Sequence, residues 1–356
     1  LFCIGEVRMN SHFLLKANIP SNDTEFSLLA KKLDKIVRQV AKGSNCLVCG
    51  KEVSSFCNSH TIPAFMLKYI SINGEVKSHG DLVFSPLDKG YKGVKQAGTF
   101  RIICRECDSI MFQNYECENN YSNINMIKTL LSEIALKTTL RVTFKRIHEM
   151  GIFYMTETSS QYASFINQIL RGKVLDLIEL KKDFDFIQNN KKNLNAFKIL
   201  FHKRLRYRVP IAVQDMINLT CEGKPLNNIY DFNKDNRLEP FYICVFPLEN
   251  ESHIIIFTKK TVKKYNQLFY TLKKMKLSEQ LKIINYLIFD NLEDYFIRPD
   301  IDISTLKELA SKVPIIAGPS PINHTDSIKL NNKDYFSSKN WESLLNLLEE
   351  QNKPVL

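Results

Sequence analysis

The sequence lacks several features that would place it in a special class of protein. No run approaches the roughly 18 uninterrupted apolar residues that a membrane-spanning helix needs. The opening segment, LFCIGEVRMNSHFLL, does not show the ordered charged, apolar and cleavage regions of a signal peptide. Internal repeats, low-complexity segments and Gly/Ser-rich linkers are also missing. We therefore expect a cytoplasmic protein that makes no use of a membrane.

Cysteine, by contrast, occurs nine times in the 356 residues. Without an export signal, these side chains are expected to be thiols and metal ligands rather than a disulfide framework. A hydrophobic content of 44% is enough for a sizeable core. The formal net charge of +11 favours a polyanionic partner, because neutralising phosphates releases counterions. The Lys-, Asn- and Ile-rich composition that an AT-rich genome produces would explain the charge equally well.

Hydrophobic patterning predicts an α+β fold. Apolar residues at helical spacing predict helices over 25–42, 122–150, 162–189, 260–294, 304–313 and 337–351. Phe197 to Thr220 and Phe241 to Thr258 favour strands, and the second segment reads as a hairpin around a Glu-Asn-Glu-Ser turn. The frequent glycines between Asn73 and Gly98 predict short strands and turns rather than a helix, in a looped insertion. We place a boundary near residue 150, between a domain at 44–150 with a helical lead-in (1–43) and a mixed α+β module at 151–356.

Two CxxC pairs carry the strongest chemical signal. Cys46-Leu-Val-Cys49 and Cys104-Arg-Glu-Cys107 each form a knuckle that places two sulfurs on one side of a tetrahedral ion. Four thiolates match Zn²⁺, so the sequence predicts a structural zinc site. Buried core cysteines placed by chance, or a redox dithiol at one CxxC, are the alternatives.

The order of motifs between Ser44 and Glu118 resembles a known family. A CxxCG knuckle is followed by a polar stretch, a His-x-Ile-Pro element at His60, a variable insertion, and an apolar-Cys-x-x-Cys that opens a helix. This order is similar to the zinc-stapled branch of the HNH endonucleases. The resemblance implies a treble-clef-like ββα unit with flanking helices. It also implies that His60 is the general base, beside a divalent cation such as Mg²⁺ that contacts the scissile phosphate.

The predicted cation site departs from the family pattern. Ser59 stands where the family has an acidic residue, and a hydroxyl is a weaker ligand for Mg²⁺ than a carboxylate. Asp108 stands where the family usually has Asn or His. On a helix that continues beyond Cys107, Asp108 and Glu116 would lie at related positions and could supply oxygens. The predicted catalytic residues are therefore His60, Asp108 and Glu116.

Basic segments are the candidates for phosphate contacts. In HKRLRYR, a strand would place Arg204, Arg206 and Arg208 on one face around a tyrosine, which suits backbone contacts and base stacking. A solvated strand face is the equal alternative. The second basic run, Lys259 to Lys264, is expected to be a solvated helix start. Cys57 is expected to be a buried thiol.

Two functions follow. The first is an HNH-like, metal-dependent endonuclease that hydrolyses phosphodiester bonds, in bacterial phage defence or a mobile element, as the resemblance implies. The second is a non-catalytic, zinc-stabilised nucleic-acid-binding or scaffold protein with a degenerate HNH site, which Ser59 favours. In both cases DNA is expected as the partner rather than RNA. The C-terminal module is expected to recognise the substrate or a protein partner.

Overall fold

A computed structural model describes residues 43–79, 90–155, 160–219, 238–304, 306 and 334–350, with only the backbone given for 152–155 and 160–169. The helix expected over 25–42 lies outside these residues, as does most of 304–313. Within the described part of the chain, helices and sheets combine in a mixed α+β fold, as the sequence predicts. No helix in this part is long and apolar enough to cross a membrane.

The N-terminal region contains a short antiparallel pair of strands followed by a helix. Strand β1 (Ser59–His60) pairs antiparallel with β4 (Thr99–Phe100), and α4 (Arg105–Met111) begins soon after β4. Pro63 disfavours helical conformations in the residue before it, which explains why no helix begins between His60 and Pro63. The next helix, α2 (Ala64–Ile70), starts directly after this proline. His60 is therefore at a strand end, as expected.

The main sheet contains seven antiparallel strands in the order β3-β2-β9-β6-β7-β8-β5. Its strands are β2 (Glu75–Ser78), β3 (Tyr91–Gly93), β5 (Phe197–Leu205), β6 (Ile211–Ile217), β7 (Phe241–Pro247), β8 (Ser252–Lys259) and β9 (Tyr295–Ile297). Strand β2 pairs with β9 at Lys77 and Ile297, so the sheet joins strands from both sides of the boundary proposed near residue 150. The short strands expected within 73–98 are present as β2 and β3, but they belong to the main sheet and not to a separate looped insertion. These strands are stabilised by a partner far away in the sequence.

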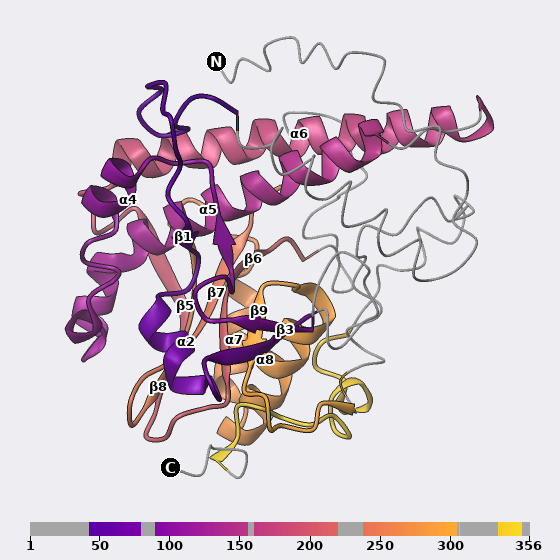
Figure 1. Cartoon of the computed structure of the whole chain (residues 1–356). Coiled ribbons are helices and arrows are strands. Elements are labelled where there is room, and N and C mark those ends of the chain that lie inside the picture. The colour runs from indigo at the N-terminus through magenta and orange to yellow at the C-terminus, as the bar shows by residue number, and fades with distance from the viewer. Residues whose placement is uncertain are drawn as a thin grey trace.

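Helices cover both faces of this sheet. Two long helices, α5 (Ile124–Met155) and α6 (Ser160–Asn190), run alongside each other across the upper part of Figure 1. The short 3-10 helix η2 (Glu118–Tyr121) leads into α5. Helices α7 (Asn266–Lys274) and α8 (Leu277–Asn291) pack on the opposite face of the sheet from α5. The helices expected over 122–150 and 162–189 and the hairpin of β7 with β8 are thus confirmed.

Strand β7 shows how the sheet serves two hydrophobic cores. Its residues Tyr242 and Cys244 belong to the core that contains the buried residues of α5 and the zinc-ligand candidates. The alternate residues Ile243 and Val245 belong to the core formed with α7 and α8. This alternation follows from the two-residue period of a strand. The cysteine-containing region and α5 therefore share one face of the sheet.

The C-terminal segment differs from its predicted helix. Within 334–350, the regular structure is the 3-10 helix η4 (Ser338–Asn340). The side chain of Asn285 on α8 donates to the carbonyl of Leu345 (2.9 Å) and accepts from the backbone N–H of Leu347 (3.0 Å). These contacts hold the segment against α8 in a non-helical conformation, while Trp341 and Leu348 are buried. The pattern indicated burial correctly and the secondary structure wrongly.

Candidate metal centre and the adjacent ion-pair cluster

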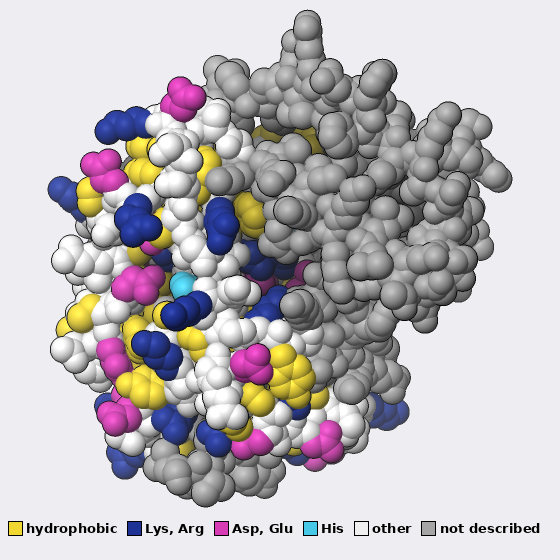
Figure 2. Space-filling model, in the orientation of Figure 1, with side chains coloured by type: hydrophobic (Ala, Val, Ile, Leu, Met, Phe, Trp, Pro, Cys, Tyr) yellow, Lys and Arg dark blue, Asp and Glu magenta, His cyan; other side chains and the backbone are white. Residues whose placement is uncertain are grey.

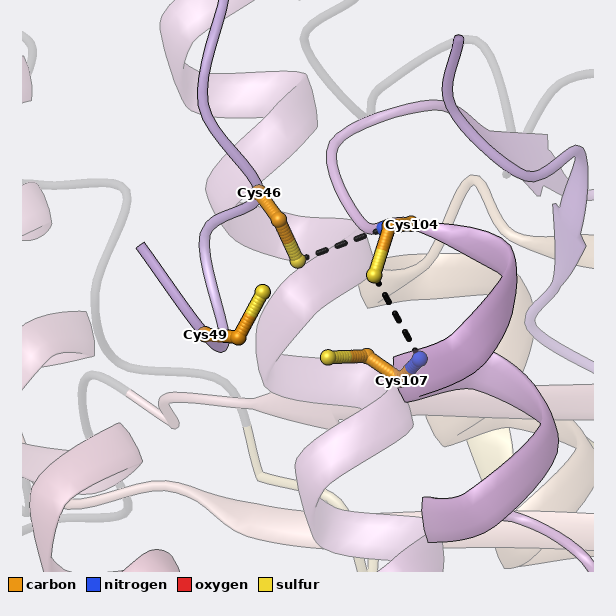
Figure 3. A group of neighbouring side chains, drawn as sticks. All are labelled: Cys46, Cys49, Cys104 and Cys107. Atoms are coloured by element: carbon orange, nitrogen blue, oxygen red, sulfur yellow. Dashed lines mark hydrogen bonds between the residues drawn. The ribbon is translucent and has the colours of Figure 1, made fainter. Parts of the chain in front are cut away.

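The four cysteines of the two CxxC pairs converge. Their sulfur atoms all lie within 4.8 Å of one another, and no other such group of three or more potential ligands is found in the described residues. Figure 3 shows the sulfurs pointing toward a common centre, with Cys46 and Cys49 on a loop and Cys104 and Cys107 at the start of α4. Four sulfurs around Zn²⁺ at about 2.3 Å would be about 3.8 Å apart, so small movements would complete a tetrahedral site.

Local backbone geometry places the sulfurs. After the first knuckle, Gly50 adopts φ +71°, a left-handed conformation that favours glycine, and its N–H donates to the carbonyl of Cys46 (2.8 Å). In the second knuckle, Cys104 is the N-cap of α4, and its sulfur accepts from the N–H of Cys107 (3.4 Å). The N–H of Cys104 in turn donates to the sulfur of Cys46 (3.2 Å). Such N–H groups directed at sulfur are suited to thiolate ligands.

The protonation chemistry of the cluster also fits a cation. Burial opposes ionisation of Cys46, but hydrogen bonds from the backbone at Cys49, Cys104 and Val48 lower its pKa to about 7. Burial raises the pKa of Cys107, as do hydrogen bonds to the neighbouring thiols. The protein alone therefore favours one thiolate, and the negative charge of this thiolate disfavours ionisation of a second cysteine. A bound divalent cation would supply the charge that four thiolates need.

His60 is oriented by a single backbone contact. Its Nε2 lies 3.0 Å from the carbonyl oxygen of Val94, which can only accept, so Nε2 carries the proton. In the neutral ring, Nδ1 then holds the lone pair. Burial lowers the pKa of His60; the Val94 contact and Asp108 oppose this, while the charge of Lys137 adds to it. The imidazole is neutral at neutral pH and lies within electrostatic reach of Asp108, as the predicted base would.

The expected cation site contains the ammonium group of Lys137. This residue, on α5, is completely buried, and its Nζ lies 2.8 Å from both Asp108 Oδ1 and Ser59 Oγ. The Ser59 hydroxyl donates to the same Asp108 oxygen (2.6 Å). Nζ also lies 3.8 Å from the centroid of the Phe112 ring, a cation–π distance. Burial tends to raise the pKa of Asp108, but the charge and hydrogen bond of Lys137, with those from Ser59 and Cys57, hold it below its usual range.

Glu116 also lies near the Lys137 ammonium, but not because it shares a helix with Asp108, as was expected. Helix α4 ends at Met111, so Asp108 and Glu116 do not share a helix face. The chain turns after Phe112 and brings Glu116 Oε1 to 3.6 Å from Lys137 Nζ. Burial raises the pKa of Glu116, against the effect of Lys137. We call Ser59, Asp108, Glu116 and Lys137 the ion-pair cluster.

Lys137 was missed by the sequence reasoning, although a signal was present. The apolar stripe of α5 runs through Ile127, Leu130, Leu131 and Ile134. The next positions at helical spacing are Lys137 and Thr138, so a lysine falls on the buried stripe. Lysine is almost never fully buried unless it is paired, so its place on this stripe predicts a carboxylate nearby.

Cys57 belongs to this environment and not to the metal centre. Its thiol donates to Asp108 Oδ2 (3.2 Å). Burial raises its pKa to about 11, and the hydrogen bond and charge of Asp108 act in the same direction. The thiol therefore stays protonated at neutral pH, and Cys57 is half-buried rather than buried as expected.

The predicted arginine face is only partly on a strand. Strand β5 ends at Leu205, so Arg204 is on it and Arg206 and Arg208 follow it. Arg204 forms an ion pair with Glu251. Arg208 donates to the carbonyl of Glu249 (3.1 Å) and its guanidinium carbon lies 5.6 Å from the Tyr69 ring centroid. Two of the three arginines thus have partners within the protein.

A charged cavity of about 310 Å³ is a further feature that the sequence did not indicate. It lies between α5, α6 and the end of β6, and many of its ionisable groups pair with one another, such as Lys173 with Glu149 (2.6 Å). Asp215 lines it with 6% exposure. Burial raises the pKa of Asp215 to about 7, opposed by Lys145 and reinforced by Asp294. Its lining comes from separate segments, so no local motif reveals it.

The basic side chains do not gather on the face drawn in Figure 2, where Lys and Arg alternate with Asp and Glu over the described residues. The chain matches no protein-family model, and no curated protein or solved structure matches it either. The functional assignment therefore depends on the residues and geometry of the chain itself.

Proposed function

We propose that residues 44–118 form a zinc-bound, treble-clef-like unit related to the zinc-stapled HNH endonucleases, and that the protein binds nucleic acid without hydrolysing it. The observation that carries this proposal is the buried ammonium of Lys137. It lies 2.8 Å from Asp108 and 3.6 Å from Glu116, the two carboxylates expected to hold a catalytic cation. A divalent metal ion would have to displace a cation that is already attached to the protein.

Zinc is the metal that the cysteine cluster supports. Four soft thiolate ligands and a closed, four-coordinate arrangement are typical of structural zinc rather than of Mg²⁺, which prefers oxygen ligands and retained water. All four ligands come from the protein, which leaves no position for a substrate. In this proposal the zinc holds the loop of the first knuckle to the start of α4.

Nucleic acid, with DNA favoured by the family resemblance, is the partner that the charge supports. The formal net charge of +11 lowers the free energy of association with a polyphosphate, and salt screens this effect. The resemblance also keeps a role in bacterial phage defence or in a mobile element as an expectation.

Metal-dependent cleavage of DNA is the second candidate, and His60 is the observation that favours it. A neutral imidazole whose Nε2–H is held by the Val94 carbonyl has Nδ1 free to take a proton from water. For this candidate, Asp108 would have to exchange Lys137 for a metal ion when substrate binds.

One experiment separates the two candidates. The protein is incubated with plasmid DNA, single-stranded DNA and RNA in the presence of Mg²⁺, Mn²⁺ or Ni²⁺, beside a His60→Ala variant with the same zinc content. Binding is measured in parallel by fluorescence anisotropy across a range of salt concentrations. We expect no cleavage above the level of the variant, and binding that weakens steeply with salt.

The opposite results are equally informative. Cleavage that needs a divalent cation and is lost in His60→Ala would overturn the non-hydrolytic proposal and establish the endonuclease. Absence of both cleavage and binding would overturn the assignment to nucleic acid and leave a scaffold role.

A further inference from the structure

The second basic run identified in the sequence lies in a segment that has no acidic residue. Between Lys259 and Ser278 the chain contains seven lysines and neither Asp nor Glu. Lys259 forms an ion pair with Asp183 (2.6 Å) and Lys264 with Glu239 (3.1 Å). The other five lysines of this segment, together with one from β5, form what we call the α7 lysine surface: Lys198, Lys260, Lys263, Lys273, Lys274 and Lys276.

These six lysines lie at the two ends of α7. At the start of the helix, Lys198 Nζ donates to Asn266 Oδ1 (2.7 Å), and the N–H of Lys260 donates to the carbonyl of Ala196 (2.9 Å). Burial lowers the pKa of Lys198, and so does the charge of Lys263, which therefore lies close to it. Lys273 and Lys274 are in the last turn of α7. Nine helical residues separate the two groups by about 13 Å, a length that spans several phosphates.

The charges of this surface are not neutralised from within the protein. Within the described residues, none of the six lysines has a carboxylate at ion-pair distance. Five of them are exposed, the exception being the half-buried Lys198. In this respect the surface differs from Arg204, which forms an ion pair with Glu251. Uncompensated, exposed ammonium groups are the ones that gain most from contact with phosphate.

An exposed aromatic ring adds a second element of recognition. Tyr270 lies on the outer face of α7 with 56% exposure, and Lys274 Nζ lies 4.1 Å from its ring centroid. The apolar residues Leu268, Phe269 and Leu272 point into the core. The helix therefore has no apolar face to insert into a bilayer, whereas lysines beside one tyrosine suit a phosphate backbone and an unpaired base.

We propose that the α7 lysine surface is the site where the protein contacts the phosphate backbone of nucleic acid, with Tyr270 stacking on an unpaired base. This inference rests on the nucleic-acid binding proposed above and names the surface responsible. It assigns the salt-dependent contacts to α7 and not to the arginines at the end of β5.

The test compares two variants that lose the same charge. One carries Lys263→Gln, Lys273→Gln and Lys274→Gln; the control carries Arg204→Gln, Arg206→Gln and Arg208→Gln. The affinity for a fluorescent single-stranded oligonucleotide and for its duplex is measured by anisotropy against salt concentration. We expect the slope of log K against log salt to fall by about 2–3 in the lysine variant, at about 0.7–0.9 for each phosphate that is no longer neutralised, and by less than about 1 in the control.

Each result decides a different point. If the wild type binds and the lysine variant keeps the wild-type slope, the α7 surface is wrong while nucleic-acid binding stands. If the wild type does not bind, the proposed function itself fails. A Tyr270→Leu variant should weaken binding to the single strand more than to the duplex, and equal effects would refute stacking. Tighter binding to phosphatidylserine vesicles than to either oligonucleotide, abolished in the lysine variant, would assign the surface to a membrane instead. Circular dichroism and thermal melting show whether each variant is folded.

Discussion

Replacing Lys137 by methionine tests whether the ion-pair cluster is a structural unit. Methionine has a similar length and no charge, so Lys137→Met removes the ammonium while filling most of the space. The Asp108 carboxylate, with 21% side-chain exposure, would keep its hydrogen bonds from Ser59 and Cys57 but lose the one cation that lies at ion-pair distance among the described residues. Breaking a buried ion pair by removing one partner costs about 3–5 kcal/mol. Because Asp108 retains some solvent access, we expect Lys137→Met to lower the free energy of unfolding by about 3 kcal/mol.

A double-mutant cycle gives the interaction itself. Asp108→Asn alone should cost somewhat less, since Lys137 keeps Glu116 at 3.6 Å as a partial partner. In Lys137→Met combined with Asp108→Asn neither charge is left unpaired, so the double variant should be more stable than the sum of the two single effects predicts. We expect a coupling energy of about 2 kcal/mol, within the range found for residues in contact.

Urea denaturation followed by circular dichroism measures these differences, with zinc content determined for each variant. Lys128→Met, an exposed position on α5, is the matched control and should change stability by less than about 0.5 kcal/mol. The pKa of Asp108 is held below its usual value, so the stability it contributes is present above about pH 4 and is lost as pH falls through the lower folded-state pKa. The loss of stability caused by Lys137→Met should therefore be smaller at acidic pH, where Asp108 is protonated. Additive single effects, within about 0.5 kcal/mol, would refute the pairing of Lys137 with Asp108.

Two further predictions concern other parts of the molecule. Protein purified without added metal should carry about one zinc per chain. The Cys46→Ser and Cys104→Ser variants should lose this zinc and unfold in the N-terminal region, whereas Cys117→Ser, at an exposed cysteine, should keep both the zinc and the fold. Elemental analysis that finds folded, zinc-free wild-type protein would contradict this prediction. Asp215 has a pKa raised to about 7 by burial, so the folded protein keeps a proton that the unfolded chain releases above about pH 4, and stability is lost as pH rises through this window. Asp215→Asn should therefore be more stabilising at pH 8 than at pH 5, and equal effects in urea denaturation at the two pH values would contradict the raised pKa.

The features that the sequence predicted well depend on short-range constraints. Each CxxC pair is one turn, so its two sulfurs can be placed without knowledge of the fold, and the four sulfurs do converge. The non-helical backbone between His60 and Pro63 agrees with the restriction that the proline places on the residue before it. Helix α5 follows from the apolar residues at helical spacing near its start, Ile127, Leu130, Leu131 and Ile134.

The features that the sequence did not predict depend on contacts between distant segments. The sequence predicts short strands near β2 and β3 but places them in a looped insertion, whereas β2 joins the main sheet by pairing with residues more than two hundred positions later, as at Lys77 and Ile297. The segment 337–351 has helical spacing, but hydrogen bonds from Asn285 hold it in another conformation. In both cases tertiary contacts override local preference.

Ser59 and Lys137 together explain why the candidate cation site is closed. The ammonium of Lys137 is attached to α5, so it occupies the site without the entropy cost that a free metal ion would have on binding. With a hydroxyl at Ser59, the nearest carboxylate, Asp108 at 2.8 Å, is balanced by the positive charge of Lys137, and Glu116 lies farther from this ammonium, at 3.6 Å. A carboxylate at position 59 would leave an excess of negative charge that a divalent ion could neutralise. We therefore expect a Lys137→Met variant that also carries Ser59→Asp to bind Mn²⁺ where the wild type does not, which isothermal titration with zinc retained can measure. Failure of that double variant to bind, while it remains folded, would show that the charges of these two residues alone do not close the site.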